Sequence, residues 1–460
     1  MRFFKPNTFW AGTLYFLILL SIAFWARDIP YQLDSFSTIQ QLINASKMGD
    51  PASFATAAID IAANGWISST NEWILNLWPP GFILLEAFII KVMGINAPII
   101  LVLQILAAGL FSIVLLLLYT QLKTSVNSKL ALILPLLTFA FPMSRVFLLE
   151  PNGVILGESF AIGFFLLGVL LILRSVMQSS LRCAVYAGLC LALAAYFRSQ
   201  FELILLSLTG WGVLLVIVIQ FTRLRNLIEP SAVKFTVKTI AITLLVAHVA
   251  TAPWRIYHMV HPHYNAEIQK YEGSLAWVYT SQLVYENSVK STAQLSGSAA
   301  FIFAGGGNLV CRIDPLTCGD LLNAKKLFFK TFMAHPIEWC LLKFESIGKY
   351  WFSSIESKKK GKLEVTTASI ATDVLLLMVL IVLLVLLFTR KVKLHASWGL
   401  LLWSNASLFS AYMLIFTLIH FEARYFYFPK IAGIFMMLIM ACIYFRPINK
   451  IDTLSKETAK

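Results

Sequence analysis

The chain has 460 residues, of which 58% are hydrophobic and only 13% are charged, and its mean hydropathy is +0.76. A soluble domain carries about 25% charged residues, so this composition excludes an ordinary soluble globular protein. The formal net charge is +14. Because lysines and arginines cluster beside apolar runs, we expect the charge to report membrane topology and not binding to nucleic acid.

Repeated runs of about 20 apolar residues predict an all-α polytopic membrane protein with about ten transmembrane helices, within a range of about nine to thirteen. The first run lacks a small-residue cleavage site, which favours a retained anchor over a removed signal peptide. The runs at 129–146 and 183–197 are short, so either is a tilted or a re-entrant helix. The expected spans are 8–26, 98–120, 129–146, 152–173, 183–197, 203–221, 236–254, 370–389, 395–419 and 425–445.

Basic residues fall after every second expected crossing, which predicts cytoplasmic positions for them and for both termini. They include Arg2, Lys5, Lys123, Lys129, Arg174, Arg182, Arg223, Arg225, Arg390 and Arg446. The spans then divide the chain into three parts. We expect a transmembrane catalytic module at 1–254 with a first external loop at 27–97, an external loop region at 255–368, and C-terminal transmembrane helices at 369–460.

The first external loop predicts interfacial helices. Residues 34–48 fit an amphipathic helix, and Asp34 is then either its N-cap or a reactive carboxylate just outside the membrane. Further on, Pro79 and Pro80 precede an apolar helix at 81–93, which is too short to span and is expected along the interface. The apolar face of the first helix would carry Phe36, Ile39, Leu42 and Ile43.

The second external region offers fewer signals. Cys311 and Cys318 predict a local disulfide if their compartment is oxidising, and their spacing does not match a structural zinc site. The run Lys358–Lys360 is either a solvated charge cluster or a contact with anionic lipid head groups. We predict no cofactor, and the histidines around 258–263 do not support a divalent metal.

Polar side chains recur at the external ends of the expected spans. Glu150 and Glu158 flank the start of the span at 152–173, and a carboxylate that deep in an apolar segment is costly and predicts a function. Such charges otherwise serve as membrane anchors, but here acids and arginines gather on one side. A carboxylate can act as a general base on a hydroxyl, and arginines can hold a departing phosphate. The arginines on this side are Arg198, Arg255 and Arg424.

The ordered set of these features resembles the C-type membrane glycosyltransferases, which transfer sugars from polyprenyl-phosphate donors at the outer face. It is most similar to the branch that holds the protein O-mannosyltransferases, the aminoarabinose transferases and lipopolysaccharide-core transferases. Each motif is weak alone. The matching residues are Asp34, Gly49-Asp50, Pro79-Pro80-Gly81-Phe82, Gly94, Glu158-Ser159, Arg174, Pro253-Trp254-Arg255, His335-Pro336, Arg424-Tyr425 and Pro429.

The resemblance implies an inverting transferase in which Asp34 is the general base. Aminoarabinose transferases carry a lysine before the two prolines, and here that position is Trp78, so phosphate binding is expected to fall to arginines. The candidate catalytic residues are Asp34 and Glu158. The candidate donor-phosphate ligands are Arg198, Arg255 and Arg424. The candidate sugar or acceptor pocket is Tyr31, Trp78, Glu150 and Tyr425, with no metal ligand.

The expected partners are a polyprenyl-phosphate sugar, a lipid, glycan or protein acceptor, and membrane lipids. The expected location is a bacterial inner membrane with the active site external, in cell-envelope glycan biosynthesis. The alternative hypothesis is that the protein is a lipid-linked glycan polymerase or ligase. A lipid-linked glycan transporter is a weaker alternative, because the sequence contains no internal repeat.

Overall fold

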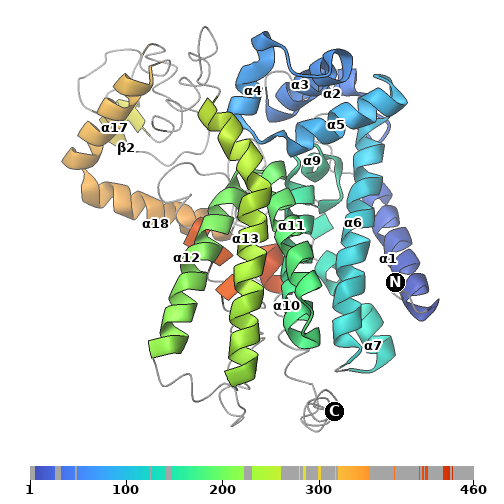
Figure 1. The fold of residues 1–460 in the computed structure, drawn as a ribbon. Coiled ribbons are helices and arrows are strands. Elements are labelled where there is room, and N and C mark those ends of the chain that lie inside the picture. Colours follow the sequence, from blue (N-terminus) through green and yellow to red (C-terminus); the bar gives the residue numbers. More distant parts are fainter. Residues whose placement is uncertain are drawn as a thin grey trace.

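The computed structural model describes residues 6–25, 33–46, 49–124, 126–140, 144–145, 148–221, 230–260, 279, 283–285, 299–301, 316 and 320–352, with separate positions between 374 and 438. These residues form helices and one small antiparallel strand pair (Figure 1). The spans predicted at 370–389, 395–419 and 425–445 lie mostly outside the described residues. The described residues therefore do not establish the ten predicted transmembrane spans.

Three helices of the described part are long and apolar enough to cross a membrane. They are α6 (Ile99–Leu122), α10 (Glu158–Gln178) and the segment 235–258 of α13 (Pro230–Val260), which correspond to three predicted spans. Shorter apolar stretches lie in α1 (Pro6–Trp25), α11 (Leu181–Phe197) and α12 (Gln200–Phe221). Helices α6, α10 and α13, which are long enough to span, make the chain a candidate integral membrane protein.

The span expected at 129–146 is not one regular α-helix over its described residues, 129–140 and 144–145. The chain instead forms a short helix, α7 (Ser128–Ile133), followed by a 3-10 helix, η2 (Leu134–Ala140). Pro135 lies at this junction, where its ring and its missing N–H interrupt α-helical hydrogen bonding. The expected span at 183–197, in contrast, is one unbroken helix, α11.

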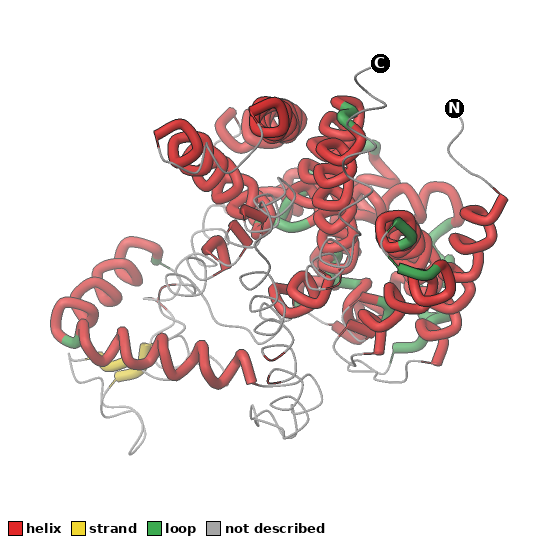
Figure 2. Tube along the Cα trace, turned by 90° about the horizontal axis from the view of Figure 1, so that it is seen from below, coloured by secondary structure: helices red, strands yellow, loops and turns green. Residues whose placement is uncertain are grey.

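The bundle helices approach one another closely at glycines. A Cβ atom on Gly188 of α11 would lie 2.5 Å from the carbonyl oxygen of Thr243 in α13, and one on Gly163 of α10 would lie 2.5 Å from Leu110 of α6. Thr243 also donates a hydrogen bond of 3.1 Å to the carbonyl of Ala184 in α11. Small residues and hydroxyls at helix contacts are typical of packing inside membranes, where apolar burial does not itself drive association. Figure 2 shows the same helices from below.

Short helices form a second layer across one end of the bundle (Figure 1). We call this the upper layer. The helix predicted after the two prolines is confirmed as α5, with Pro80 in its first turn, and its position along the membrane interface stays a prediction. The helix expected at 34–48 is shorter, and a second helix follows it. The upper layer consists of α2 (Ile39–Ser46), α3 (Asp50–Asn64), η1 (Ser69–Asn71), α4 (Glu72–Leu77) and α5 (Pro80–Met93).

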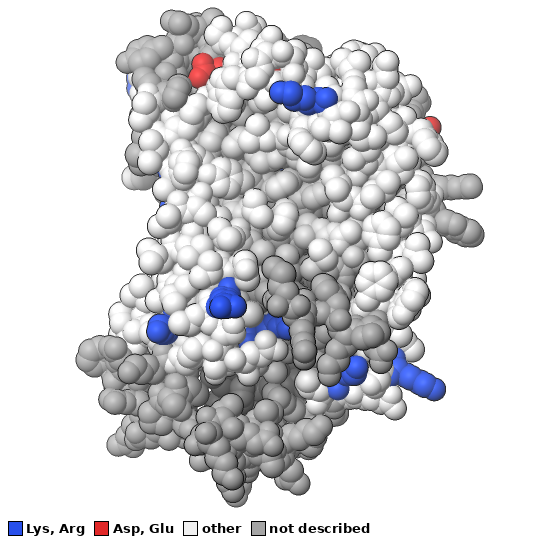
Figure 3. Space-filling model, turned by 45° about the vertical axis from the view of Figure 1, so that its right-hand side comes forward, with Lys and Arg blue, Asp and Glu red and all other residues white. Residues whose placement is uncertain are grey.

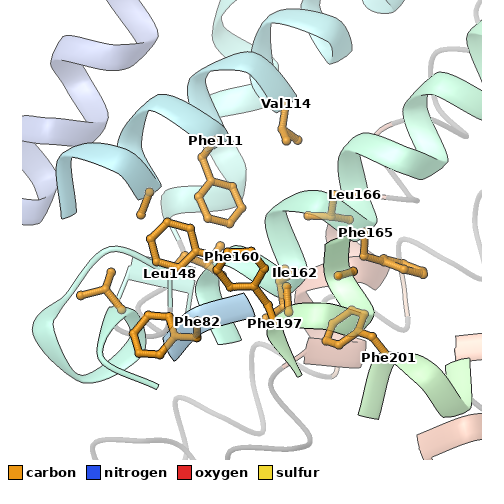
Figure 4. Close-up of a cluster of buried hydrophobic side chains, with 14 of the residues drawn as sticks. Phe82, Phe111, Val114, Leu148, Phe160, Ile162, Phe165, Leu166, Phe197 and Phe201 are labelled. Atoms are coloured by element: carbon orange, nitrogen blue, oxygen red, sulfur yellow. The ribbon is translucent and has the colours of Figure 1, made fainter. Parts of the chain in front are cut away.

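Phe82 of α5 joins the upper layer to the bundle. Its ring centroid lies 5.7 Å from Phe54 of α3, 6.1 Å from Phe160 of α10 and 6.5 Å from Phe197 of α11. Phe160 and Phe197 stack on each other at 5.4 Å (Figure 4). Gly157, at φ +72°, makes room for Phe82, since a Cβ there would lie 2.8 Å from its Cγ atom. Aromatic contacts of this kind add about 0.5–1.5 kcal/mol each beyond area burial.

The region predicted as an external loop holds two unexpected helices and the strand pair. Strand β1 (Leu283–Tyr285) pairs antiparallel with β2 (Ala299–Phe301). Helix α17 (Leu321–Ala334) and helix α18 (Pro336–Phe352) are joined at His335. Asp320 caps α17 by accepting hydrogen bonds from the backbone N–H groups of Leu322 (2.8 Å) and Asn323 (3.2 Å), a strong helix-start signal.

Basic residues mark the end of the bundle opposite the upper layer. Lys123 caps the C-terminal end of α6, Arg174 lies near the end of α10, and Arg182 lies in the first turn of α11. On the face drawn in Figure 3, most lysine and arginine atoms gather at this lower end. This charge distribution agrees with the positive-inside pattern, and the cytoplasmic position of that end stays a prediction.

The contact between α5 and α11 leaves no room for a side chain at Gly81. A Cβ atom there would lie 2.6 Å from the carbonyl oxygen of Tyr196, which is backbone and cannot rotate away. We expect Gly81→Ala to destabilise the protein by about 1–3 kcal/mol through overpacking. Gly109→Ala is the matched control, because nothing lies within 4 Å of its Cβ position. Thermal unfolding in detergent measures the stability of both variants. Equal melting temperatures for Gly81→Ala and Gly109→Ala would contradict the close contact.

Candidate functional site

Asp34 is an exposed carboxylate held by a turn. Its Oδ1 atom accepts hydrogen bonds from the backbone N–H of Phe36 (2.9 Å) and from the hydroxyl of Ser37 (3.1 Å), and Ser37 Oγ accepts from the N–H of Asp34 (3.0 Å). No described residue donates to Oδ2. The exposed side chain is thus oriented through one oxygen while the other accepts no hydrogen bond from a described residue, an arrangement that allows it to take a proton from a hydroxyl.

The alternative role of Asp34 as a helix cap is wrong. Helix α2 begins at Ile39, and the residues that cap it are Thr38 and Gln41. The N–H of Thr38 donates to Gln41 Oε1 (2.8 Å), and the N–H of Gln41 donates to Thr38 Oγ1 (3.4 Å). This reciprocal pair is a capping box. The fixed position of Asp34 therefore comes from its own turn with Ser37 and not from helix formation.

Glu158 and Arg198 form a buried ion pair. Arg198 Nη2 lies 3.0 Å from Glu158 Oε1, and the two side chains are only 4% and 7% exposed. Arg198 Nη1 also donates to the carbonyl of Leu156 (3.4 Å). Since Glu158 opens α10 and Arg198 follows α11, the pair holds these helix ends together. The geometry favours a positioning role, and the catalytic role of Glu158 and the phosphate-binding role of Arg198 stay predictions.

Glu150 is buried where three elements meet. It precedes α9 (Pro151–Val154), and its backbone carbonyl accepts from the N–H of Gly153 (3.1 Å). The side chain of Gln104 in α6 donates to the carbonyl of the adjacent Leu149 (3.0 Å) and to that of Ala23 in α1 (3.2 Å). The sequence did not indicate Gln104. Glu150 lies in protein interior, and its role in an acceptor or sugar pocket stays a prediction.

Trp78 packs inside the upper layer. Its ring meets Phe54 edge-on at 5.2 Å and lies 5.9 Å from Trp73. It therefore helps to join α3 to the segment that enters α5. Trp78 remains partly exposed, so its role in a sugar pocket stays a prediction, and its aromatic ring cannot replace a phosphate-binding lysine.

Arg255 belongs to a polar network between α12 and α13. Its Nε atom lies 2.5 Å from Glu202 Oε1, and the side chains are 26% and 31% exposed. Its Nη1 atom lies 2.9 Å from His248 Nδ1, and His248 Nε2 lies 2.8 Å from the hydroxyl of Thr209. Nη2 is buried and has no hydrogen-bond partner among the described residues. An unmet guanidinium donor is costly, and an added anion or water would satisfy it.

Aromatic rings lie beside Arg255 on the last turns of α13. Trp254 and Tyr257 stack with centroids 5.4 Å apart and planes 10° apart, and His258 meets Trp254 edge-on at 4.2 Å. Tyr257 also donates a hydrogen bond of 3.0 Å to Glu72 Oε1 in α4. The half-exposed Trp66 lies 6.2 Å from Tyr257. Together these rings form an aromatic platform between the upper layer and α13, which the sequence signalled only through its external tryptophans.

Two other carboxyl groups of the upper layer have contrasting environments. Burial raises the pKa of Asp60, but hydrogen bonds from Ser68, Asn71 and Asn64 outweigh it, so the pKa is below its usual value. Glu86 in α5 is fully buried, neither carboxyl oxygen has a hydrogen-bond partner in the described part of the chain, and burial raises its pKa well above the usual value. Asp60 is therefore ionised at neutral pH, whereas Glu86 is held as a neutral acid.

The structure brings only some of the predicted residues together. Glu158 contacts Arg198, and Arg255 contacts Glu202, but no described contact joins Asp34 to either pair. Among the described residues, no group of three His, Cys, Asp or Glu side chains is arranged to hold a metal ion. Several predicted positions lie outside the described residues, namely Tyr31, Arg424, Tyr425, Cys311, Cys318 and Lys358–Lys360.

No protein-family model matches this chain, and no curated protein matches it either.

The buried pair generates a test that separates a structural from a catalytic role. We expect Glu158→Gln and Arg198→Met each to lower the free energy of unfolding by about 3–5 kcal/mol, because each leaves one polar or charged group without its partner. The double variant should lose less than the sum of the two. Thermal or denaturant unfolding in detergent measures the free energy of unfolding of the wild type, the two single variants and the double variant. Loss of activity at unchanged stability would instead favour catalytic and phosphate-binding roles.

Proposed function

We propose that the protein is a membrane glycosyltransferase that moves a sugar from a polyprenyl-phosphate donor to an acceptor hydroxyl at the external membrane surface. Asp34 is the proposed general base, and Arg255 is the proposed donor-phosphate ligand among the described residues. The acceptor hydroxyl would attack the anomeric carbon as Asp34 takes its proton. The bond from that carbon to the phosphate oxygen would break, and the polyprenyl phosphate would leave with inversion.

The observation that carries the proposal is the geometry of Asp34. Two donors orient one of its oxygens, and the other is open in an exposed turn at the start of the upper layer. A general base must be both accessible and held in place. An oriented carboxylate beside an apolar bundle suits a reaction between a lipid-borne donor and an acceptor that arrives from water.

Arg255 and the aromatic platform support the donor half of the proposal. A guanidinium stays protonated under all ordinary conditions and can stabilise the negative charge that grows on a departing phosphate. The unpartnered Nη2 atom gives Arg255 capacity for one further hydrogen bond. The apolar surfaces of the bundle helices offer a setting in which a polyprenyl chain can remain in lipid. Glu202 and His248 would orient the guanidinium.

The first test replaces the proposed base. We expect Asp34→Asn to reduce sugar transfer by about 10²–10⁴-fold, the usual contribution of a general base. Ser37→Ala is the matched variant, because it removes one hydrogen bond to the carboxylate but keeps the base, and it should cause a smaller loss. The assay follows release of polyprenyl phosphate from a panel of polyprenyl-phosphate sugars, with purified protein in nanodiscs and candidate acceptors. Transfer by Asp34→Asn at the wild-type rate would exclude this base.

The second test concerns the donor. We expect Arg255→Ala to raise the donor concentration needed for half-maximal transfer by at least tenfold, which corresponds to about 1.4 kcal/mol, because a charge-assisted contact to the phosphate is lost. Arg255→Lys should retain part of the affinity. Glu202→Gln keeps the guanidinium and removes its ion-pair partner, so it controls for the network. Equal donor affinity in Arg255→Ala and wild type would exclude the assignment.

A further inference from the structure

Helices α17 and α18 each present an apolar face to the outside. In α18, Ile337, Leu341 and Phe344 are 73%, 63% and 75% exposed. Their spacing of four and three residues places them in one stripe along the helix. Exposed apolar patches of this kind mark interaction surfaces, since isolated apolar side chains are common on proteins but continuous stripes are not.

The opposite side of α18 is the packed side. Trp339 meets Phe332 of α17 edge-on at 5.3 Å, and Lys343 Nζ lies 5.1 Å above the Trp339 ring. Trp339 follows Ile337 by two residues, which is about 200° around a helix. The apolar stripe therefore faces away from the contacts between the two helices.

The outward face of α17 has the same character, with lysines on both flanks. Leu322, Phe329 and Met333 are 60%, 54% and 77% exposed and share one face, while Ala324 and Thr331 on the other side are buried. Lys326 and Lys330, both exposed, border this apolar face, and Lys325 borders its other edge. An apolar face flanked by lysines is typical of helices that lie in a membrane interface, where the lysine stems remain in lipid and the charges reach the head groups.

The orientation of α18 fits such a position. It extends sideways from the bundle in Figure 1 and lies across the page in Figure 2, which looks along the bundle from below. A helix that runs across the direction of membrane-crossing helices lies along the membrane plane. We propose that the outward faces of α17 and α18 rest on the bilayer surface and that the α17 lysines contact anionic lipid head groups there.

The charge of this surface comes from α17. Lys343 of α18 is buried, and burial lowers its pKa to about 7, so it adds little to the lipid-facing charge. Lysines close to an anionic membrane surface are attracted to its head groups. Lys326 and Lys330 are therefore the residues whose charge matters most for the choice of lipid.

A nitroxide on α18 tests the proposal in the full-length protein. Cys340 is exposed and lies four residues before Phe344, on the apolar side, so it can carry the label once the other five cysteines are replaced. Power-saturation spectroscopy in nanodiscs compares its accessibility to oxygen, which enters lipid, with that to a water-soluble nickel chelate. The matched control is Glu338→Cys with Cys340→Ser, because the Glu338 side chain is 63% exposed and lies off the apolar stripe.

We expect the oxygen-to-nickel ratio to be severalfold higher at Cys340 than at position 338. A ratio equal to that of the control would overturn the proposal, since the face would then contact water. Low accessibility to both reagents would also overturn it, because protein and not lipid would then cover the face.

The lysines are tested in discs of two compositions. We expect Lys326→Glu with Lys330→Glu to lower the ratio at Cys340 in discs that contain phosphatidylglycerol, and to have little effect in phosphatidylcholine discs. Lys123→Glu with Lys129→Glu makes the same charge change at the other end of the bundle and should leave the ratio unchanged. An unaltered ratio for the α17 variant in anionic discs would overturn the role of anionic lipid.

Discussion

The close approach of α5 to the ends of α10 and α11 is the contact on which the rest of the structure depends. Gly81 lets the α5 backbone reach the Tyr196 carbonyl, and Phe82 fills the space that Gly157 leaves open. A side chain at either glycine would force the two layers apart. Because the upper layer carries Asp34, this contact fixes how the proposed base stands relative to the bundle.

The polar groups follow from the same constraint. Apolar helices leave few positions where a charge can be hydrated, so charges inside the bundle must find partners. Glu158 and Arg198 neutralise each other in the interior at the helix ends that receive Phe82, while Arg255 and Glu202 remain partly open to water. The buried pair of Glu158 and Arg198 therefore stabilises the fold, whereas the partly exposed pair of Arg255 and Glu202 retains capacity for a ligand.

The sequence predicted the elements that depend on local patterns. Apolar runs indicated α6, α10 and α13, and the two prolines indicated the start of α5. The sequence could not predict that Arg198 pairs with Glu158, because these residues are 40 positions apart and meet only through the packing of α10 on α11. The hydrogen bond from Tyr257 to Glu72 spans 185 positions and is likewise a product of tertiary structure. Helices α17 and α18 were missed because their lysines interrupt the apolar run that marks a membrane span.

Environment also decides which carboxyl group of the upper layer can serve as a base. Glu86 is buried without partners, and its raised pKa keeps it protonated, so it can neither reach a substrate nor accept a proton. Asp60 is ionised, but the donors that lower its pKa also occupy its oxygens and weaken it as a base. Asp34 is exposed, oriented through one oxygen and open at the other. Of these three carboxyl groups, Asp34 alone combines access to water with a free oxygen, which is why we assign proton transfer to it.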